Sequence, residues 1–199
     1  QQNLPRAISY ECELGQIECY IAKNDLKVAN FLLMKLNKEK PGDPRLLYLV
    51  ANAALDRREY EAAFRTFQDA LNQDPSLTQA LEPMTRAALA LKLYEQAYTT
   101  ALLFSKHYDS PEVKLILART LIVNKREPEA EQILKELITA DGRNARAMYL
   151  LSRLYKRTGK VQDWNKYRQD AVKIDGNVAA NYDLPELDIE DSISIPDKK

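Results

Sequence analysis

The stretch Arg58-Glu-Tyr-Glu-Ala-Ala-Phe-Arg-Thr-Phe-Gln-Asp-Ala-Leu-Asn-Gln-Asp-Pro75 decides the fold, because its pattern returns further along the chain. Tyr60 and Ala63 are followed 34 residues later by Tyr94 and Ala97. A fixed period of this length is typical of a helical solenoid, in which each helix-turn-helix unit buries its apolar face by stacking on a neighbour. The sequence therefore predicts an array of helix pairs.

The quoted stretch resembles the second helix of a tetratricopeptide repeat, and the resemblance covers residues 10–177 as about five repeats. It implies an all-α fold, a right-handed helical-repeat superhelix (α-solenoid) of about five helix-turn-helix units. Residues 1–9 are then a lead-in, and residues 178–199 are an extended or disordered acidic tail. The degenerate repeat signatures are more similar to those of bacterial members of this family than to eukaryotic co-chaperones.

Two residues depart from the repeat pattern. Pro83 falls inside the first turns expected for the first helix of the third repeat, so that helix either starts late or is bent. Trp164 stands where the family has a small residue, and we expect it to have a structural role. The tyrosines at the family's packing positions, which include Tyr60, Tyr94 and Tyr155, are also expected to pack.

The C-terminal segment combines charge with an apolar edge. It has five acidic residues between 183 and 191, and Leu187, Ile189, Ile193 and Ile195 alternate with polar residues. This period of two describes an extended segment with one apolar side. Such a segment is either disordered or docked on its own array or on that of a neighbour, and the last alternative would give a homodimer.

Composition excludes several classes of partner. Lys plus Arg (29) cancels Asp plus Glu (29), so no global charge attracts nucleic acid. No apolar run approaches the length that spans a bilayer, so we expect no direct membrane insertion. Cys12 and Cys19 lie roughly 10 Å apart along one helix and cannot pair with each other. Unpaired thiols favour the cytoplasm, and a periplasmic location requires that a signal peptide was removed.

Catalytic motifs are not evident. The single histidine, His107, has no partner motif, and two cysteines do not make a zinc site. The sequence contains no Gly-rich phosphate loop and no Gly-x-Ser-x-Gly or His-Glu-x-x-His motif. We therefore expect no enzymatic activity, no metal and no cofactor.

The resemblance implies that the first helix of each repeat lines a concave groove. The groove residues that it assigns here are polar or aromatic: Tyr48, Asn52, Arg86, Arg119, Tyr149, Arg153, Lys156 and Arg157. Arginine binds carboxylates through two parallel hydrogen bonds, so this groove favours an extended acidic segment or a chain terminus. The alternative is that these arginines only pair with surface carboxylates such as Glu82 or Glu112, which contributes little.

These patterns predict a non-enzymatic scaffold or adaptor that binds a protein or peptide partner in its groove. The clamp by which some co-chaperones of this family hold chaperone C-termini is incomplete, since Tyr48 stands in place of its lysine and Thr85 in place of its second asparagine. The alternative is a regulatory module excised from a longer signalling or enzymatic protein. A start at Gln1 rather than Met motivates that alternative.

Overall fold

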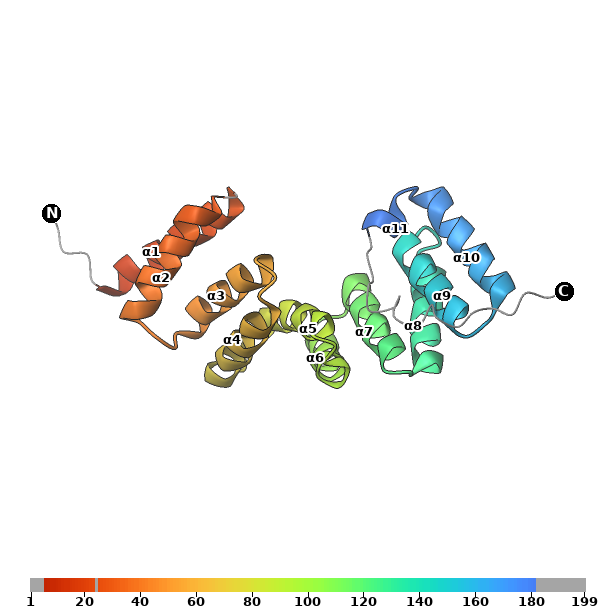
Figure 1. Ribbon diagram of the computed structural model, residues 1–199, viewed down its shortest axis with the longest axis horizontal. Helices are drawn as coiled ribbons and strands as arrows, with labels where there is room; N and C mark the ends of the chain where they lie inside the picture. Colours follow the sequence, from red (N-terminus) through yellow and green to blue (C-terminus); the bar gives the residue numbers. More distant parts are fainter. Residues whose placement is uncertain (1–5, 24, 182–199) are drawn as a thin grey trace. The chain divides into compact units, whose positions relative to one another are not determined.

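The computed structural model describes residues 6–23 and 25–181, and within these ranges the chain is helical with connecting turns and no strand (Figure 1). The elements are α1 (Arg6–Ala22), α2 (Leu26–Glu39), α3 (Pro44–Asp56), α4 (Tyr60–Gln73), the 3₁₀ turn η1 (Thr78–Ala80), α5 (Leu81–Ala90), α6 (Tyr94–His107), α7 (Pro111–Val123), α8 (Glu127–Ala140), α9 (Ala145–Arg157), α10 (Val161–Ile174) and α11 (Val178–Asn181). The prediction of an all-α array of helix pairs is confirmed.

The even-numbered helices α2 to α10 are the second helices of five repeats. Each of them is 14 residues long, and their first residues are Leu26, Tyr60, Tyr94, Glu127 and Val161. Because these starts are 33 or 34 residues apart, equivalent positions can be compared between repeats without gaps. The odd-numbered helices α1 to α9 are the first helices.

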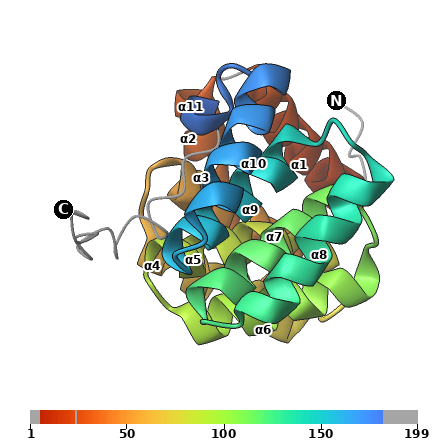
Figure 2. The ribbon, with the colours of Figure 1, turned by 90° about the vertical axis from the view of Figure 1, so that its right-hand side faces the viewer.

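The chain divides into two compact units, residues 1–87 and 88–199. In the first unit α1 packs on α2, α2 on α3 and α3 on α4. In the second unit α6, α7, α8, α9 and α10 contact one another in chain order, and α7 to α10 can be followed in Figure 2. Such neighbour-only packing is what defines a solenoid.

Local signals set the starts of the first helices. Asp43 caps α3, because its Oδ1 accepts hydrogen bonds from the backbone N–H groups of Arg45 (3.0 Å) and Leu46 (3.3 Å). Ser110 caps α7 and Asn144 caps α9 in the same way. Prolines at the first position of α3 and α7 lose no intrahelical hydrogen bond there.

The turns inside four repeats share one backbone conformation. Arg58, Lys92, Lys125 and Gly159 each have φ between 59° and 74° and stand just before the second helix. Only Gly159 adopts this left-handed region without steric cost, and a side chain there costs on the order of 1 kcal/mol. Three repeats tolerate the cost because the helices on either side fix the turn.

The late start predicted as one alternative for the third repeat is observed. The turn η1 precedes α5, which begins at Leu81, so Pro83 lies in the first turn, where its missing N–H group breaks no helical hydrogen bond. Trp164 occupies the fourth position of α10 and packs, half-buried, against the core of the second unit. Tyr155 is fully buried in that core.

Both ends of the array differ from expectation. Helix α1 begins at Arg6, inside the stretch expected to be a lead-in. Helix α11 occupies the start of the stretch expected to be extended, because Val178 is buried against Met148 and Ala171 and extends the core by one turn. Residues 182–199, which include the acidic run, lie outside the described residues. The thiols of Cys12 and Cys19 are both free and exposed.

Small residues allow the second helices to approach their neighbours. Ala63 and Ala97, each the fourth residue of its helix, have no exposed surface. Replacing either with leucine should lower the free energy of unfolding by about 1–3 kcal/mol, because the added atoms have no space. The exposed neighbour Ala62 offers a matched control, and Ala62→Leu should unfold at the wild-type denaturant midpoint. Equal effects of Ala62→Leu and Ala63→Leu would contradict the assigned register.

Candidate partner-binding surface

The residues predicted to line the groove occupy equivalent positions of the first helices. Asn52, Arg119 and Arg153 are the ninth residues of α3, α7 and α9, each of which has 13 residues. Arg86 is the ninth residue counted from Thr78, where η1 begins. The repeat register read from the sequence therefore holds at all four positions.

In the first unit, the two predicted residues on α3 make internal contacts. The ring of Tyr48 is half-buried and packs on Phe67, with centroids 6.1 Å apart and planes inclined by 57°. Asn52 Nδ2 donates a hydrogen bond to the Tyr48 carbonyl oxygen at 2.9 Å. Its side chain also lines a cavity of about 70 Å³ together with Ile21, Asn30 and Asp56. Tyr48 therefore contributes mainly to packing.

Arg86 is the exposed member of the set. Its guanidinium, with 54% of the side chain exposed, lies 3.7 Å from Glu82 one turn earlier on α5. This matches the expectation that Glu82 pairs with a groove arginine. Exposed pairs of this kind contribute little and are readily exchanged for another carboxylate.

In the second unit, α7 and α9 contact each other and carry Arg119 and Arg153 at the same position. Both side chains are half-buried. Tyr149 lies one turn before Arg153 and packs against the cores below it with part of its surface exposed. This unit thus carries two arginines and one tyrosine on adjacent first helices.

The basic residues at the end of α9 have different roles. Arg157 Nη2 donates a hydrogen bond to Glu127 Oε1 at 2.6 Å, and only 17% of its side chain is exposed. This pair ties the end of α9 to the start of α8, so the charge of Arg157 is engaged inside the unit. Lys156 Nζ lies 6.0 Å from the centre of the Trp164 ring, within range of a cation–π contact.

Two ion pairs between successive first helices escaped the sequence reasoning. Arg45 donates two hydrogen bonds of 2.9 Å to the carboxylate of Glu11, and Arg146 donates one of 3.0 Å to Glu112. The partners are 34 residues apart in both pairs. Opposite charges at one repeat period were the signal that could have revealed them. The hydrogen bond from Arg45 lowers the pKa of Glu11 below its ordinary value.

A polar cluster joins α8 to α9. The carboxylate of Glu131 lies 2.7 Å from Lys135 Nζ and accepts hydrogen bonds from Tyr155 Oη (2.8 Å) and Lys160 Nζ (3.2 Å). The bond from Lys135, helped by the other two, lowers the pKa of Glu131 to about 2 against the opposing effect of burial. Burial and the bond to Glu131 raise the pKa of Tyr155 to about 12.

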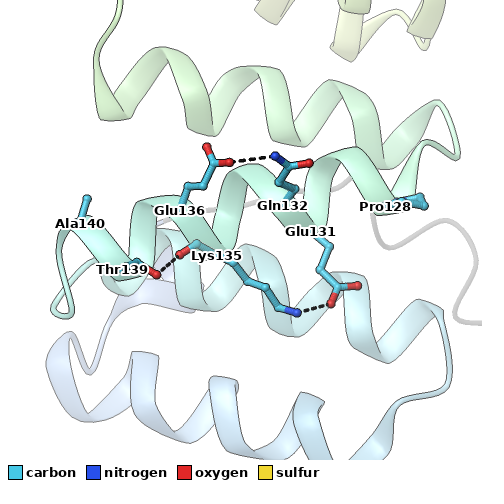
Figure 3. A pocket seen from close by; sticks show the side chains of 7 residues that line it. All are labelled: Pro128, Glu131, Gln132, Lys135, Glu136, Thr139 and Ala140. Atoms are coloured by element: carbon cyan, nitrogen blue, oxygen red, sulfur yellow. Dashed lines mark hydrogen bonds and ion pairs between the residues drawn. The ribbon is translucent and has the colours of Figure 1, made fainter.

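The outer face of α8 carries a shallow pocket next to this cluster (Figure 3). Gln132 donates to Glu136 at 3.0 Å, and Thr139 donates to the Lys135 carbonyl oxygen at 2.8 Å. Apart from Glu131, whose carboxylate belongs to the cluster described above, the polar groups of this face bond to one another along α8, which is how a solvated face is arranged. We assign it no ligand.

Among the described residues, no group of three or more His, Cys, Asp and Glu side chains is arranged to hold a metal ion. Within the same ranges, no helix has the length and apolarity needed to cross a bilayer.

The fold can be compared with solved structures. YrrB, described as a TPR protein with an unusual peptide-binding site, superposes with a TM-score of 0.73 at 15% identity, over 89% of this chain and 95% of YrrB. MamA gives 0.68 at 14% identity, over 82% and 96% of the two chains. The chain has the tetratricopeptide-repeat fold. PilF from Pseudomonas aeruginosa gives 0.66 at 15% identity, over 92% and 88%.

The sequence does not show the similarity that the structures show. No family model matches the sequence, and no curated protein resembles it closely enough to count as a relative. The structures therefore establish the fold, and the binding surface is argued from this chain alone.

The Glu131 cluster gives a pH-dependent contribution to stability. Because the folded-state pKa of Glu131 is about 2 and its ordinary value is 4.5, the contribution is fully present above about pH 4.5 and is lost as the pH falls towards 2. Since Lys135 is half exposed, we expect it to be on the order of 1 kcal/mol.

Urea unfolding of Glu131→Gln at neutral and acidic pH tests this contribution. The variant should be less stable at pH 7 and should lose less stability than wild type as the pH falls. Glu136→Gln is the matched control, because the Glu136 carboxylate accepts its hydrogen bond from a neutral amide. If Glu131→Gln lost as much unfolding free energy as wild type between neutral and acidic pH, the assignment of this contribution to Glu131 would be contradicted.

Proposed function

We propose that this chain is a non-enzymatic protein–protein interaction scaffold that binds an extended acidic segment of a partner on its first helices. The core of the proposed site is Arg119 and Arg153, with Tyr149 beside them on α9. Arg86 is their counterpart in the other unit. We refer to Arg119 and Arg153, which lie on contacting helices of one unit, as the arginine surface.

The observation that carries the proposal is the recurrence of arginine at one repeat position of three first helices. Within the second unit α7 and α9 contact each other, so a chain that runs along these two repeats meets Arg119 and Arg153 in turn. Guanidinium groups suit carboxylates, and a partly exposed tyrosine adds apolar contact at low entropic cost. Tetratricopeptide folds bind peptides in at least one case, since YrrB is described as having a peptide-binding site.

The internal ion pairs sharpen the proposal. The charges of Glu11, Arg45, Glu112 and Arg146 are matched within the molecule, and Arg157 is held by Glu127. We therefore give these residues a structural role. Lys156, which lies one turn beyond Arg153, adds positive charge at the edge of the site.

The test compares two triple charge reversals of equal net charge. Arg86, Arg119 and Arg153 are replaced with glutamate in one variant. In the control, glutamate replaces Arg65, Lys166 and Arg168, which are exposed on the second helices α4 and α10. Each variant changes one residue of the first unit and two of the second. The probe is a fluorescent set of short acidic peptides, each made with a free and with an amidated C-terminus.

We expect the reversal on the first helices to weaken binding of the best peptide by about tenfold or more and to reduce its salt dependence, because screened attraction is removed. The control should bind like wild type. If binding requires a free C-terminal carboxylate, the amidated form of the peptide will also bind more weakly than the free form. Equal loss in both variants, or loss in neither, would contradict the arginine surface.

A further inference from the structure

The outer face of α2 differs from that of the other second helices. Phe31 and Met34, the sixth and ninth residues of α2, are 69% and 66% exposed. The buried side of the same helix is already filled by Leu33 and Leu36. The two exposed side chains therefore add nothing to the core of their own unit.

Other repeats show what these positions ordinarily carry. The sixth residues of α4, α6, α8 and α10 are all polar and exposed, and three of the four ninth residues are as well: Arg65, Thr99, Gln132 and Lys166 at the sixth position, and Gln68, Lys135 and Gln169 at the ninth. The ninth residue of α6, Leu102, is half-buried. Figure 3 shows the polar version of this face on α8. The fold therefore directs these positions to solvent, and among the described second helices only α2 places an aromatic residue there.

Lysines surround the two apolar side chains. Lys27, Lys35 and Lys38 are exposed, and each lies four residues from Phe31 or Met34, which places all five on one face of the helix. Glu39, at the last position, is the one acidic residue of α2, and Lys35 lies 3.8 Å from Glu13 on α1. We call Lys27, Phe31, Met34, Lys35 and Lys38 the α2 strip.

The sequence contains one segment with complementary chemistry. Residues 183–195 have five acidic side chains by position 191 and an alternating apolar edge that includes Leu187 and Ile189. Acidic groups match the three lysines, and the apolar edge matches Phe31 and Met34. An apolar centre inside a ring of opposite charges is the ordinary composition of a specific interface.

The segment and the α2 strip belong to different compact units. Helix α11 is held by α9 and α10, and residue 183 follows Asn181 by two residues, a reach of about 7 Å. Helix α2 packs mainly on α1 and α3. We propose that the α2 strip binds the acidic segment 183–195 of a second copy of this chain. The strip lies on a second helix, so this self-association is independent of the arginine surface.

Complementation between two variants provides the test. The first variant, Phe31→Gln with Met34→Gln, keeps the segment and loses the apolar part of the strip. The second variant ends at Asn181, so it keeps the strip and all the described helices and loses the segment. A control variant carries Lys166→Gln and Gln169→Ala at the same positions of α10. Each is examined by sedimentation velocity over a concentration series, after its thermal melting has been compared with wild type.

Wild type and the control should self-associate as the concentration rises. Each of the two deficient variants should stay monomeric alone, and an equimolar mixture of them should form a heterodimer, because one supplies the strip and the other the segment. Lys27→Glu with Lys38→Glu should weaken self-association and reduce its salt dependence. A wild-type chain that stays monomeric, or a mixture that does not associate, would overturn the proposal.

A labelled peptide of residues 183–199 distinguishes a second copy of the chain from the other possible occupants of the α2 strip. Binding to the truncated chain, together with loss of binding in the Phe31/Met34 variant, supports the strip as the docking site. If the peptide binds the truncated chain but the full chain is monomeric and excludes the peptide, the segment docks within its own chain and the second copy is ruled out. Binding of the strip to vesicles of anionic lipid without binding of the peptide would also overturn the proposal.

Discussion

Close contact between neighbouring helices is the constraint on which the rest of the structure depends. The fourth residue of α2, α4, α6 and α8 is alanine, and Ala29, Ala63, Ala97 and Ala130 are all buried. A methyl side chain lets the next helix approach closely, and each approach fixes which side of the helix faces the core. Because the helices pack in chain order, the same choice is repeated from one repeat to the next.

A repeated register gives repeated faces, and function can then be assigned by comparing repeats. The ninth position of the repeat carries arginine three times, counted from Thr78, Pro111 and Ala145, and supports the proposed site for an acidic partner. The sixth and ninth positions of the second helices are polar by rule, so Phe31 and Met34 stand out as an exception. Each repeat thus serves as a control for the others. A side chain that departs from the pattern can be interpreted, because the residues at the same position of the other repeats show what the fold alone requires.

The fold could be predicted from the sequence because its determinants are local. The period, the buried alanines and the proline that opens α3 can all be read without coordinates. The site could be predicted only as a list of positions. Bonds such as Arg157 to Glu127 and Tyr155 to Glu131 join residues 30 and 24 apart, and they depend on how helix ends meet in space. The exposure of Phe31 was missed, although Lys27, Lys35 and Lys38 on the same face of α2 were a signal that could have revealed it.

Hydrogen exchange in a variant with a damaged core tests neighbour-only packing most directly. Phe67 on α4 is fully buried, and Phe67→Ala should cost about 3–5 kcal/mol by leaving a cavity. Exchange of backbone amides is then measured helix by helix under native conditions. We expect protection to fall in α3 and α4, which pack on this side chain, and to stay at the wild-type level in α8 and α9. A uniform loss of protection in all helices would contradict an array that is stabilised by contacts between neighbours.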